Sequence, residues 1–247
     1  MAGALGGSLT SSSPWASAAV VVVLAVAQGP LSIRVSGIAV FAPVIAAVFS
    51  SIALPTPAIY VAIWVGVGYA FIELLSVGLR LPRSASGVER GVAWLHATMF
   101  AALAGPGVFI TQTFEVGHGY WLLLTLAVVL QPSPSAARAV GRARLAGTIT
   151  GVVAAIVLVV VMPPPLLVLA AAACTFLTVA WGIAQDIVRQ AHYGVLAILF
   201  LGSGGSLATG VDLGIERLIL TAAAVILAIA ASTALDRIER RSSSGTT

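Results

Sequence analysis

The sequence predicts an all-α, polytopic transmembrane helical bundle of about nine helices, and its composition and charge spacing both indicate this class. Hydrophobic residues make up 60% of the 247 residues and charged residues 8%, against about 25% charged residues in soluble domains. The mean hydropathy is +1.09. So few charges cannot cover a folded surface in water. This excludes a soluble enzyme, a disordered chain and a nucleic-acid-binding domain, despite a pI near 10.0.

Two long charge-free stretches set the helix count. Residues 35–72 and 145–185 carry no charged side chain, and each is about twice the ~20 residues that one membrane-spanning helix needs. Prolines near the middle of each stretch predict a tight turn, so each is expected to hold two helices. The same reasoning gives nine segments: about 15–28, 35–54, 57–79, 91–113, 117–131, 145–162, 166–185, 191–208 and 216–235. The first and fifth are short for a ~30 Å hydrocarbon core.

The distribution of arginine predicts the orientation. With the N-terminus outside, eleven of the twelve arginines fall in the inner segments, and Arg217 falls outside. This partition follows the positive-inside rule and places the C-terminus in the cytoplasm. All twelve basic residues are Arg, with abundant Ala, Val and Gly, which we interpret as the bias of a GC-rich bacterial genome. We therefore expect a multi-pass protein of the bacterial inner membrane.

Two parts of the chain are similar to each other. A run from Trp15 closes at a Gln-Gly-Pro and is followed by Arg34-Val-Ser-Gly37; a run from Trp121 closes at Gln-Pro and is followed by Arg144-Leu-Ala-Gly147. Two parallel-topology repeats would explain the match, and so would chance in an apolar alphabet. The expected domains are a flexible tail (1–14), an incomplete N-terminal transmembrane half (15–90), a C-terminal transmembrane domain (91–235) and a cytoplasmic tail (236–247).

Residues 118–151 carry a motif that resembles the FUSC family, the fusaric-acid-resistance and aromatic-acid-exporter group. His118-Gly-Tyr-Trp121 is followed by a run to Gln131-Pro132 and then by Arg144-Leu-Ala-Gly-Thr148-x-x-Gly151; His192-Tyr-Gly and Arg217-Leu-x-x-Thr221 follow later. The resemblance covers about 91–235, with a fainter N-terminal half. It implies a membrane transport protein for aromatic acids. Compared with the usual family pattern, we expect the first half to lack its opening helix and the chain to hold no soluble domain.

The motif supplies candidate substrate-binding residues, each with a structural alternative. Arg142 and Arg144 would collect an organic anion at the inner mouth and deliver it to a helix N-terminus, or they set topology and contact lipid phosphates. Thr148, beside Gly147 and Gly151, would line a substrate path, or this small-residue face packs helices.

Two further groups of candidates lie toward the outer side of the expected topology. Tyr120 and Trp121 would stack on an aromatic substrate, or they belong to an interfacial aromatic belt. Arg217 would bind an exiting anion, or it anchors the last helix through Asp212.

Ionisable groups inside the membrane are the candidates for proton coupling, because hydrocarbon makes them costly. Glu73 and His96 lie at similar depths in the third and fourth segments, counting 1.5 Å per residue. Together they would carry a proton. Alternatively, Glu73 pairs with Arg80 or Arg83, and His96 bonds to a backbone carbonyl.

We therefore expect an exporter of small aromatic or amphipathic organic acids. Because no ATP-binding P-loop is present, we expect the proton gradient to drive it. The alternative is a non-catalytic membrane subunit or scaffold. The expected partners are membrane lipids, the organic acid, and either further copies of the chain or a partner membrane protein, with no nucleic acid. No catalytic motif, cofactor or metal site is predicted, and the single Cys174 excludes a disulfide within the chain.

Overall fold

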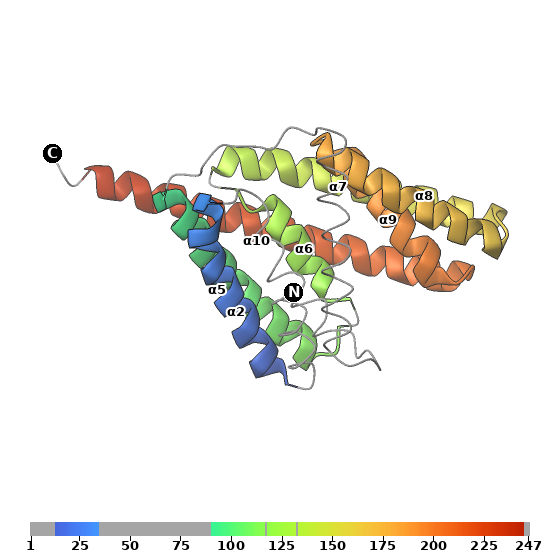
Figure 1. Cartoon of the computed structure of the whole chain (residues 1–247), viewed down its shortest axis with the longest axis horizontal. Coiled ribbons are helices and arrows are strands. Elements are labelled where there is room, and N and C mark those ends of the chain that lie inside the picture. Colours follow the sequence, from blue (N-terminus) through green and yellow to red (C-terminus); the bar gives the residue numbers. More distant parts are fainter. Residues whose placement is uncertain (1–12, 35–89, 117, 132, 245–247) are drawn as a thin grey trace. The chain divides into compact units, whose positions relative to one another are not determined.

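The described part of the chain is all α-helical. The computed structural model describes residues 13–34, 90–116, 118–131 and 133–244. These hold seven helices and no strand (Figure 1): α2 Pro14–Arg34, α5 Arg90–Thr113, α6 Tyr120–Val129, α7 Pro134–Val161, α8 Pro164–Ile183, α9 Ile187–Ser203 and α10 Leu207–Ser244. The predicted helical class is confirmed. The expected segments 35–54 and 57–79, Glu73 and most of the 1–14 tail lie outside the described residues, so nine helices and the repeat stay predictions.

Four of these helices have the length and composition of membrane spans. They are Trp94–Thr113, Pro134–Val161, Pro164–Gly182 and Leu207–Ala234. The apolar helices Pro14–Ala27, Tyr120–Val129 and Ile187–Ser203 are shorter. At 1.5 Å per residue, the 10 residues of α6 extend over about 15 Å, half of a typical hydrocarbon core. The expectation that the fifth segment is short is therefore confirmed.

The chain divides into two compact units, residues 1–132 and 133–247. We call them the N-terminal and C-terminal units and describe each by itself. The predicted domain boundary at 90/91 rested on a family pattern rather than on compactness, and it stays a prediction.

In the N-terminal unit, α2 and α5 pack as an antiparallel pair. The rings of Trp15 and Phe109 lie 4.2 Å apart between centroids, and Gly105 lies so close to Val22 that an added Cβ would be 2.5 Å from Val22 Cγ2. From the first contact to the second, the residue number increases on α2 and decreases on α5, so the two helices run antiparallel. The short helix α6 contacts α5 at Gly107, opposite Leu122.

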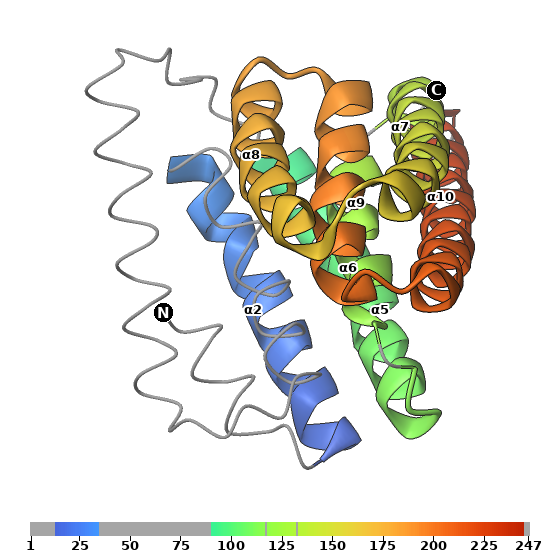
Figure 2. The ribbon, with the colours of Figure 1, turned by 90° about the vertical axis from the view of Figure 1, so that its right-hand side faces the viewer.

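The C-terminal unit is an up-and-down bundle of α7, α8, α9 and α10, whose connections are two or three residues long. Short connections make consecutive helices antiparallel, so α7 and α10 also run in opposite directions. The expected proline hairpin is confirmed, because α7 ends at Val161 and α8 begins at Pro164. Figure 2 shows α9 between α7 and α8, and α10 beside α7.

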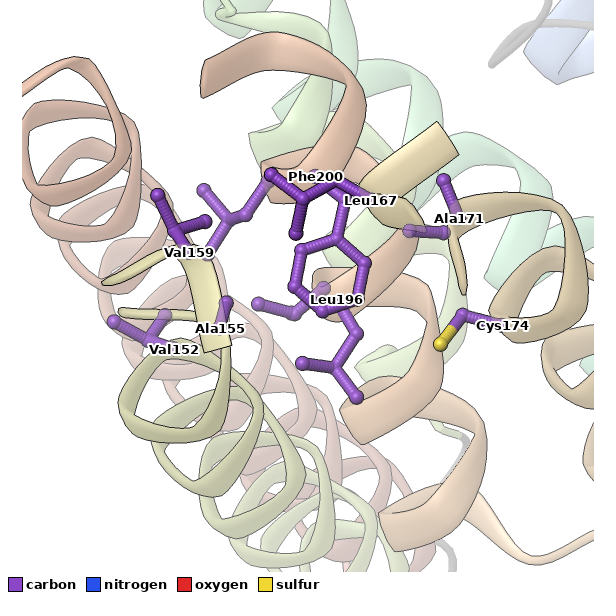
Figure 3. Close-up of a cluster of buried hydrophobic side chains, with 11 residues drawn as sticks. Val152, Ala155, Val159, Leu167, Ala171, Cys174, Leu196 and Phe200 are labelled. Atoms are coloured by element: carbon purple, nitrogen blue, oxygen red, sulfur yellow. The ribbon is translucent and has the colours of Figure 1, made fainter. Parts of the chain in front are cut away.

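An apolar cluster joins three helices of this unit. Figure 3 shows it between α7, α8 and α9, and its labelled members are Val152, Ala155, Val159, Leu167, Ala171, Cys174, Leu196 and Phe200. In lipid, such contacts stabilise a bundle through close packing rather than through exclusion of water. The cluster fixes the rotation of α7 and α9 about their axes.

Glycine brings α7 and α9 into backbone contact. A Cβ at Gly151 would lie 2.8 Å from the carbonyl oxygen of His192, and one at Gly147 would overlap the carbonyl oxygen of Val188. Side chains larger than hydrogen are excluded from both positions, since backbone cannot move aside cheaply. Gly147 and Gly151 therefore pack helices as expected, and the substrate-path role of Thr148 stays a prediction.

Two helix starts differ from the prediction. The sequence places them near 145 and 216, whereas α7 begins at Pro134 and α10 at Leu207. At α7, the Ser133 side chain accepts a hydrogen bond from the backbone N–H of Ala136, and proline follows in the first turn, which is a favourable helix start. Hydropathy marked the apolar centre of each helix and not its beginning. Residues 134–144, which lie between the predicted segments 117–131 and 145–162, are therefore helical.

Alanine at Gly151 should destabilise the C-terminal unit by about 1–3 kcal/mol, because the added methyl group forces α9 away from α7. The apparent melting temperature of the detergent-purified protein measures this. Gly210→Ala is the matched control, since its Cβ would lie 3.5 Å from Ser203 Cβ, an ordinary contact. Equal melting temperatures for the two variants would contradict the tight α7–α9 contact.

Candidate functional site

The C-terminal unit buries two arginines and two threonines on facing helices. Arg144 and Thr148 of α7 are 5% and 0% exposed, and Arg217 and Thr221 of α10 are 3% and 0% exposed. Each pair belongs to an Arg-Leu-x-x-Thr sequence. Residues four apart lie on the same face of a helix, so each helix presents an arginine and a threonine one turn apart on its buried side.

The helix register relates the two pairs. A Cβ at Gly214 of α10 would lie 2.8 Å from Val152 of α7, which sets these residues opposite each other. Because the helices are antiparallel and rise about 1.5 Å per residue, counting from this contact places Thr221 at about the level of Arg144. The same count places Arg217 at about the level of Thr148. Each arginine thus lies near the level of the other helix's threonine.

The direction of Arg144 follows from its neighbours on α7. Val152 faces α10, while Gly147 and Gly151 face α9. With about 100° of rotation per residue, Arg144 projects between these two directions, toward the junction of α7, α9 and α10.

The hydrogen bonds of this group are unevenly distributed. Thr148 donates from Oγ1 to the carbonyl oxygen of Arg144 at 2.9 Å. The buried Nε of Arg144 has no acceptor among the described residues, and the buried hydroxyl of Thr221 has no partner among them. Leaving a buried polar group unsatisfied costs about 1–3 kcal/mol, and more for a charged one. The junction therefore holds a positively charged group whose Nε–H makes no hydrogen bond to the described residues.

The placement of Arg144 and Arg217 corrects the prediction. Both were expected to open a helix, but each is the eleventh residue of its helix. Arg144 lies about 15 Å beyond the first residue of α7, so the N-terminal partial charge of that helix does not act on a ligand at Arg144. Helix α7 continues unbroken through a buried charge because the helical backbone bonds are already satisfied within the helix.

The other arginines of the expected mouth remain at the surface. Arg142 is exposed on α7, and so is Arg138. Arg189 near the start of α9 and Arg237 near the end of α10 are also exposed. Alternating helix directions bring these four positions to one end of the C-terminal unit. Arg142 is therefore not brought together with Arg144, although the two are close in sequence.

The aromatic candidates form a cluster in the N-terminal unit. Trp121 is 1% exposed, and the ring of His118 stacks on it at 4.3 Å between centroids with planes 16° apart. Tyr120 approaches Trp121 edge-on at 5.8 Å. One face of the Trp121 ring is thus occupied by a neighbour from the chain itself. This cluster and Arg144 belong to different units, each described separately.

His96 is engaged by the backbone. Its Nε2 lies 3.0 Å from the carbonyl oxygen of Leu130, to which it donates a hydrogen bond, because a carbonyl can only accept. This is the backbone-bonded alternative left open for His96, and Glu73 lies outside the described residues. Within the described ranges, no group of three His, Cys, Asp or Glu side chains is arranged to hold a metal ion.

Thr221 is a buried residue to which sequence analysis assigned no role. Its signal was the repetition of Arg-Leu-x-x-Thr at residues 144–148 and 217–221. Because α7 and α10 run antiparallel, the repeated sequence places the arginine of each helix near the level of the threonine of the other.

The four long apolar helices have the length and composition of the spans of a multi-pass membrane protein. The sequence pattern of the fusaric acid resistance protein-like family matches residues 103–231, just over half of the chain, and the chain belongs to this FUSC family. The matched region includes all of α6, α7, α8 and α9. No curated protein and no solved structure matches the chain.

Replacing Arg144 by methionine should raise the free energy of unfolding by about 1–4 kcal/mol, since an apolar side chain of similar length removes an unsatisfied buried charge. Thermal unfolding in detergent measures the change, with Arg138→Met as the exposed control expected to have no effect. A loss of stability on Arg144→Met would mean that the arginine holds the bundle together and is not kept for a ligand.

Proposed function

We propose that this protein exports small organic acids, aromatic or amphipathic, from the cytoplasm across the bacterial inner membrane. The observation that carries the proposal is the buried guanidinium of Arg144, whose Nε has no acceptor within the described residues. Charged groups inside membrane proteins are costly and mark substrate or ion pathways. An anionic cargo would supply the missing negative charge.

Family membership supports the direction and the chemistry of transport. The family takes its name from resistance to fusaric acid, and resistance to an acid is obtained when a membrane protein removes it from the cell. Fusaric acid itself combines an aromatic ring with a carboxylate, which is the kind of group that a guanidinium binds well.

The exposed arginines support an inner mouth on the cytoplasmic side. Arg138, Arg142, Arg189 and Arg237 lie at one end of the C-terminal unit, and exposed Arg residues flank membrane spans mainly on the cytoplasmic side. In this role they raise the local concentration of organic anions near the start of α7. The C-terminus is then cytoplasmic as well.

Loss of the Arg144 charge should abolish export. Cells that lack their own exporters and produce the Arg144→Gln variant should retain preloaded benzoate and lose tolerance to aromatic acids, at unchanged protein level. Glu115→Gln is the control, because Glu115 is an exposed charged residue that lies outside the residues assigned to the inner mouth. Export by Arg144→Gln at the wild-type rate would overturn the proposal.

We further propose that the proton gradient drives export through Glu73 and His96. Histidine is a common proton carrier in proteins, and His96 lies half-buried in an apolar helix. His96→Asn keeps a side-chain donor for the Leu130 carbonyl but cannot titrate. It should lower benzoate efflux from proteoliposomes that carry a pH gradient. Efflux that is the same with and without a gradient in the wild type would contradict proton coupling.

The mass of the purified protein distinguishes an exporter from a membrane subunit. An exporter is expected to be a homo-oligomer when it is purified in mild detergent, whereas a subunit would co-purify with a second membrane protein in fixed ratio. Light scattering measures the mass, and a stoichiometric partner would favour the subunit alternative.

A further inference from the structure

Seven threonines of the described helices bond their hydroxyl groups to a carbonyl oxygen of their own helix, whereas two buried threonines do not. Thr98, Thr111, Thr148, Thr150, Thr175, Thr178 and Thr233 each donate from Oγ1 to the carbonyl oxygen four residues earlier, at 2.7 to 3.0 Å. This local bond is freely available to a helical threonine. Thr221 and Thr125 are 0% exposed, yet neither hydroxyl has a partner within the described ranges.

Of these two buried threonines, Thr221 lies opposite a charged residue, Arg144. It follows Gly214 by seven residues and therefore lies on the same face of α10, the face that contacts α7 at Val152. Counting from that contact places Thr221 within about one residue of the level of Arg144. A threonine with an unused hydroxyl and an arginine with an unused Nε–H thus lie at the same depth on facing helices.

Neither Arg144 Nε nor the Thr221 hydroxyl has a hydrogen-bond partner among the described residues. Nε–H of Arg144 can only donate a hydrogen bond, and no carboxylate of the described residues forms an ion pair with it. The hydroxyl of Thr221 donates readily, and it does not use the backbone acceptor of its own helix. A guanidinium N–H and a hydroxyl at the same depth on facing helices can both donate to a group with two acceptor atoms and a negative charge. A carboxylate has this chemistry, with two oxygens and no donor.

We propose that Arg144 and Thr221 together bind one carboxylate group, with Nε–H of Arg144 donating to one oxygen and the Thr221 hydroxyl donating to the other. The inference rests on the proposed function and adds to it a specificity residue on α10. Recognition then needs both oxygens, so a monocarboxylate binds while its amide, which presents a donor in place of one oxygen, is rejected. The binding centre is formed only when α7 and α10 are packed together.

The test is calorimetric binding of benzoate to the full-length protein in detergent, with benzamide and inorganic phosphate as comparison probes. Thr221→Val has nearly the same shape without the hydroxyl and should bind benzoate at least about tenfold more weakly, the loss expected for one hydrogen bond to a charged group. Thr221→Ser keeps the hydroxyl and should bind within about threefold of wild type. Thr233→Val is the matched control on the same helix, because its hydroxyl is already bonded to the Ile229 carbonyl at 2.7 Å.

The outcomes separate the inference from the proposed function. If wild type binds benzoate and Thr221→Val binds it equally well, the two-residue site is wrong while export through Arg144 still stands. If wild type binds benzamide as tightly as benzoate, or phosphate in preference to benzoate, carboxylate recognition is wrong. If neither benzoate nor other monocarboxylates bind the wild type, the proposed function fails and the inference fails with it. Unchanged melting temperature of Thr221→Val shows that its weaker binding does not come from misfolding.

Discussion

The backbone contact between α7 and α9 is the constraint on which the candidate site depends. Gly147 and Gly151 allow the carbonyl oxygens of α9 to occupy the space that side chains would fill. This contact fixes the rotation of α7, and with it the direction of Arg144, which lies one turn before Gly147 and Thr148. In a membrane, where apolar side chains gain little by leaving lipid, such close approach is a principal source of helix association. The glycines that allow α7 and α9 to pack closely therefore also determine the direction of the Arg144 side chain.

A buried guanidinium contributes little to the stability of a fold. Its presence at Arg144 therefore indicates a role other than stabilisation. Taking the charge out of water is costly, and without a paired anion the cost is not recovered. An alkyl side chain would pack as well at the same place. The bundle instead keeps a charge at Arg144 and an unused hydroxyl at Thr221 on the facing helix. Unsatisfied polar groups lower the stability of the folded protein. Binding sites often accept this cost, because the ligand completes the hydrogen bonds.

The sequence predicted the helical class, the proline hairpin and the packing role of Gly147 and Gly151, because these follow from composition, from proline chemistry and from residue size. It misplaced Arg144, because a hydropathy pattern ends a span at the first charge whereas backbone hydrogen bonding continues past it to Pro134. It grouped Arg142 with Arg144, although two residues along a helix turn a side chain to another face and leave Arg142 exposed. The proposed role of Thr221 could not be predicted from the sequence, because it depends on contacts between helices about 70 residues apart in sequence.

The side-chain Nε–H resonance of Arg144 tests most directly whether this residue binds an anionic ligand. In a nitrogen–proton spectrum of the labelled protein, the resonance is assigned by its disappearance in Arg144→Met. Our account predicts that it shifts progressively when benzoate is added and does not shift with benzamide, while the exposed arginines respond to neither. A resonance that stays fixed under saturating benzoate, in a protein that exports benzoate, would contradict it.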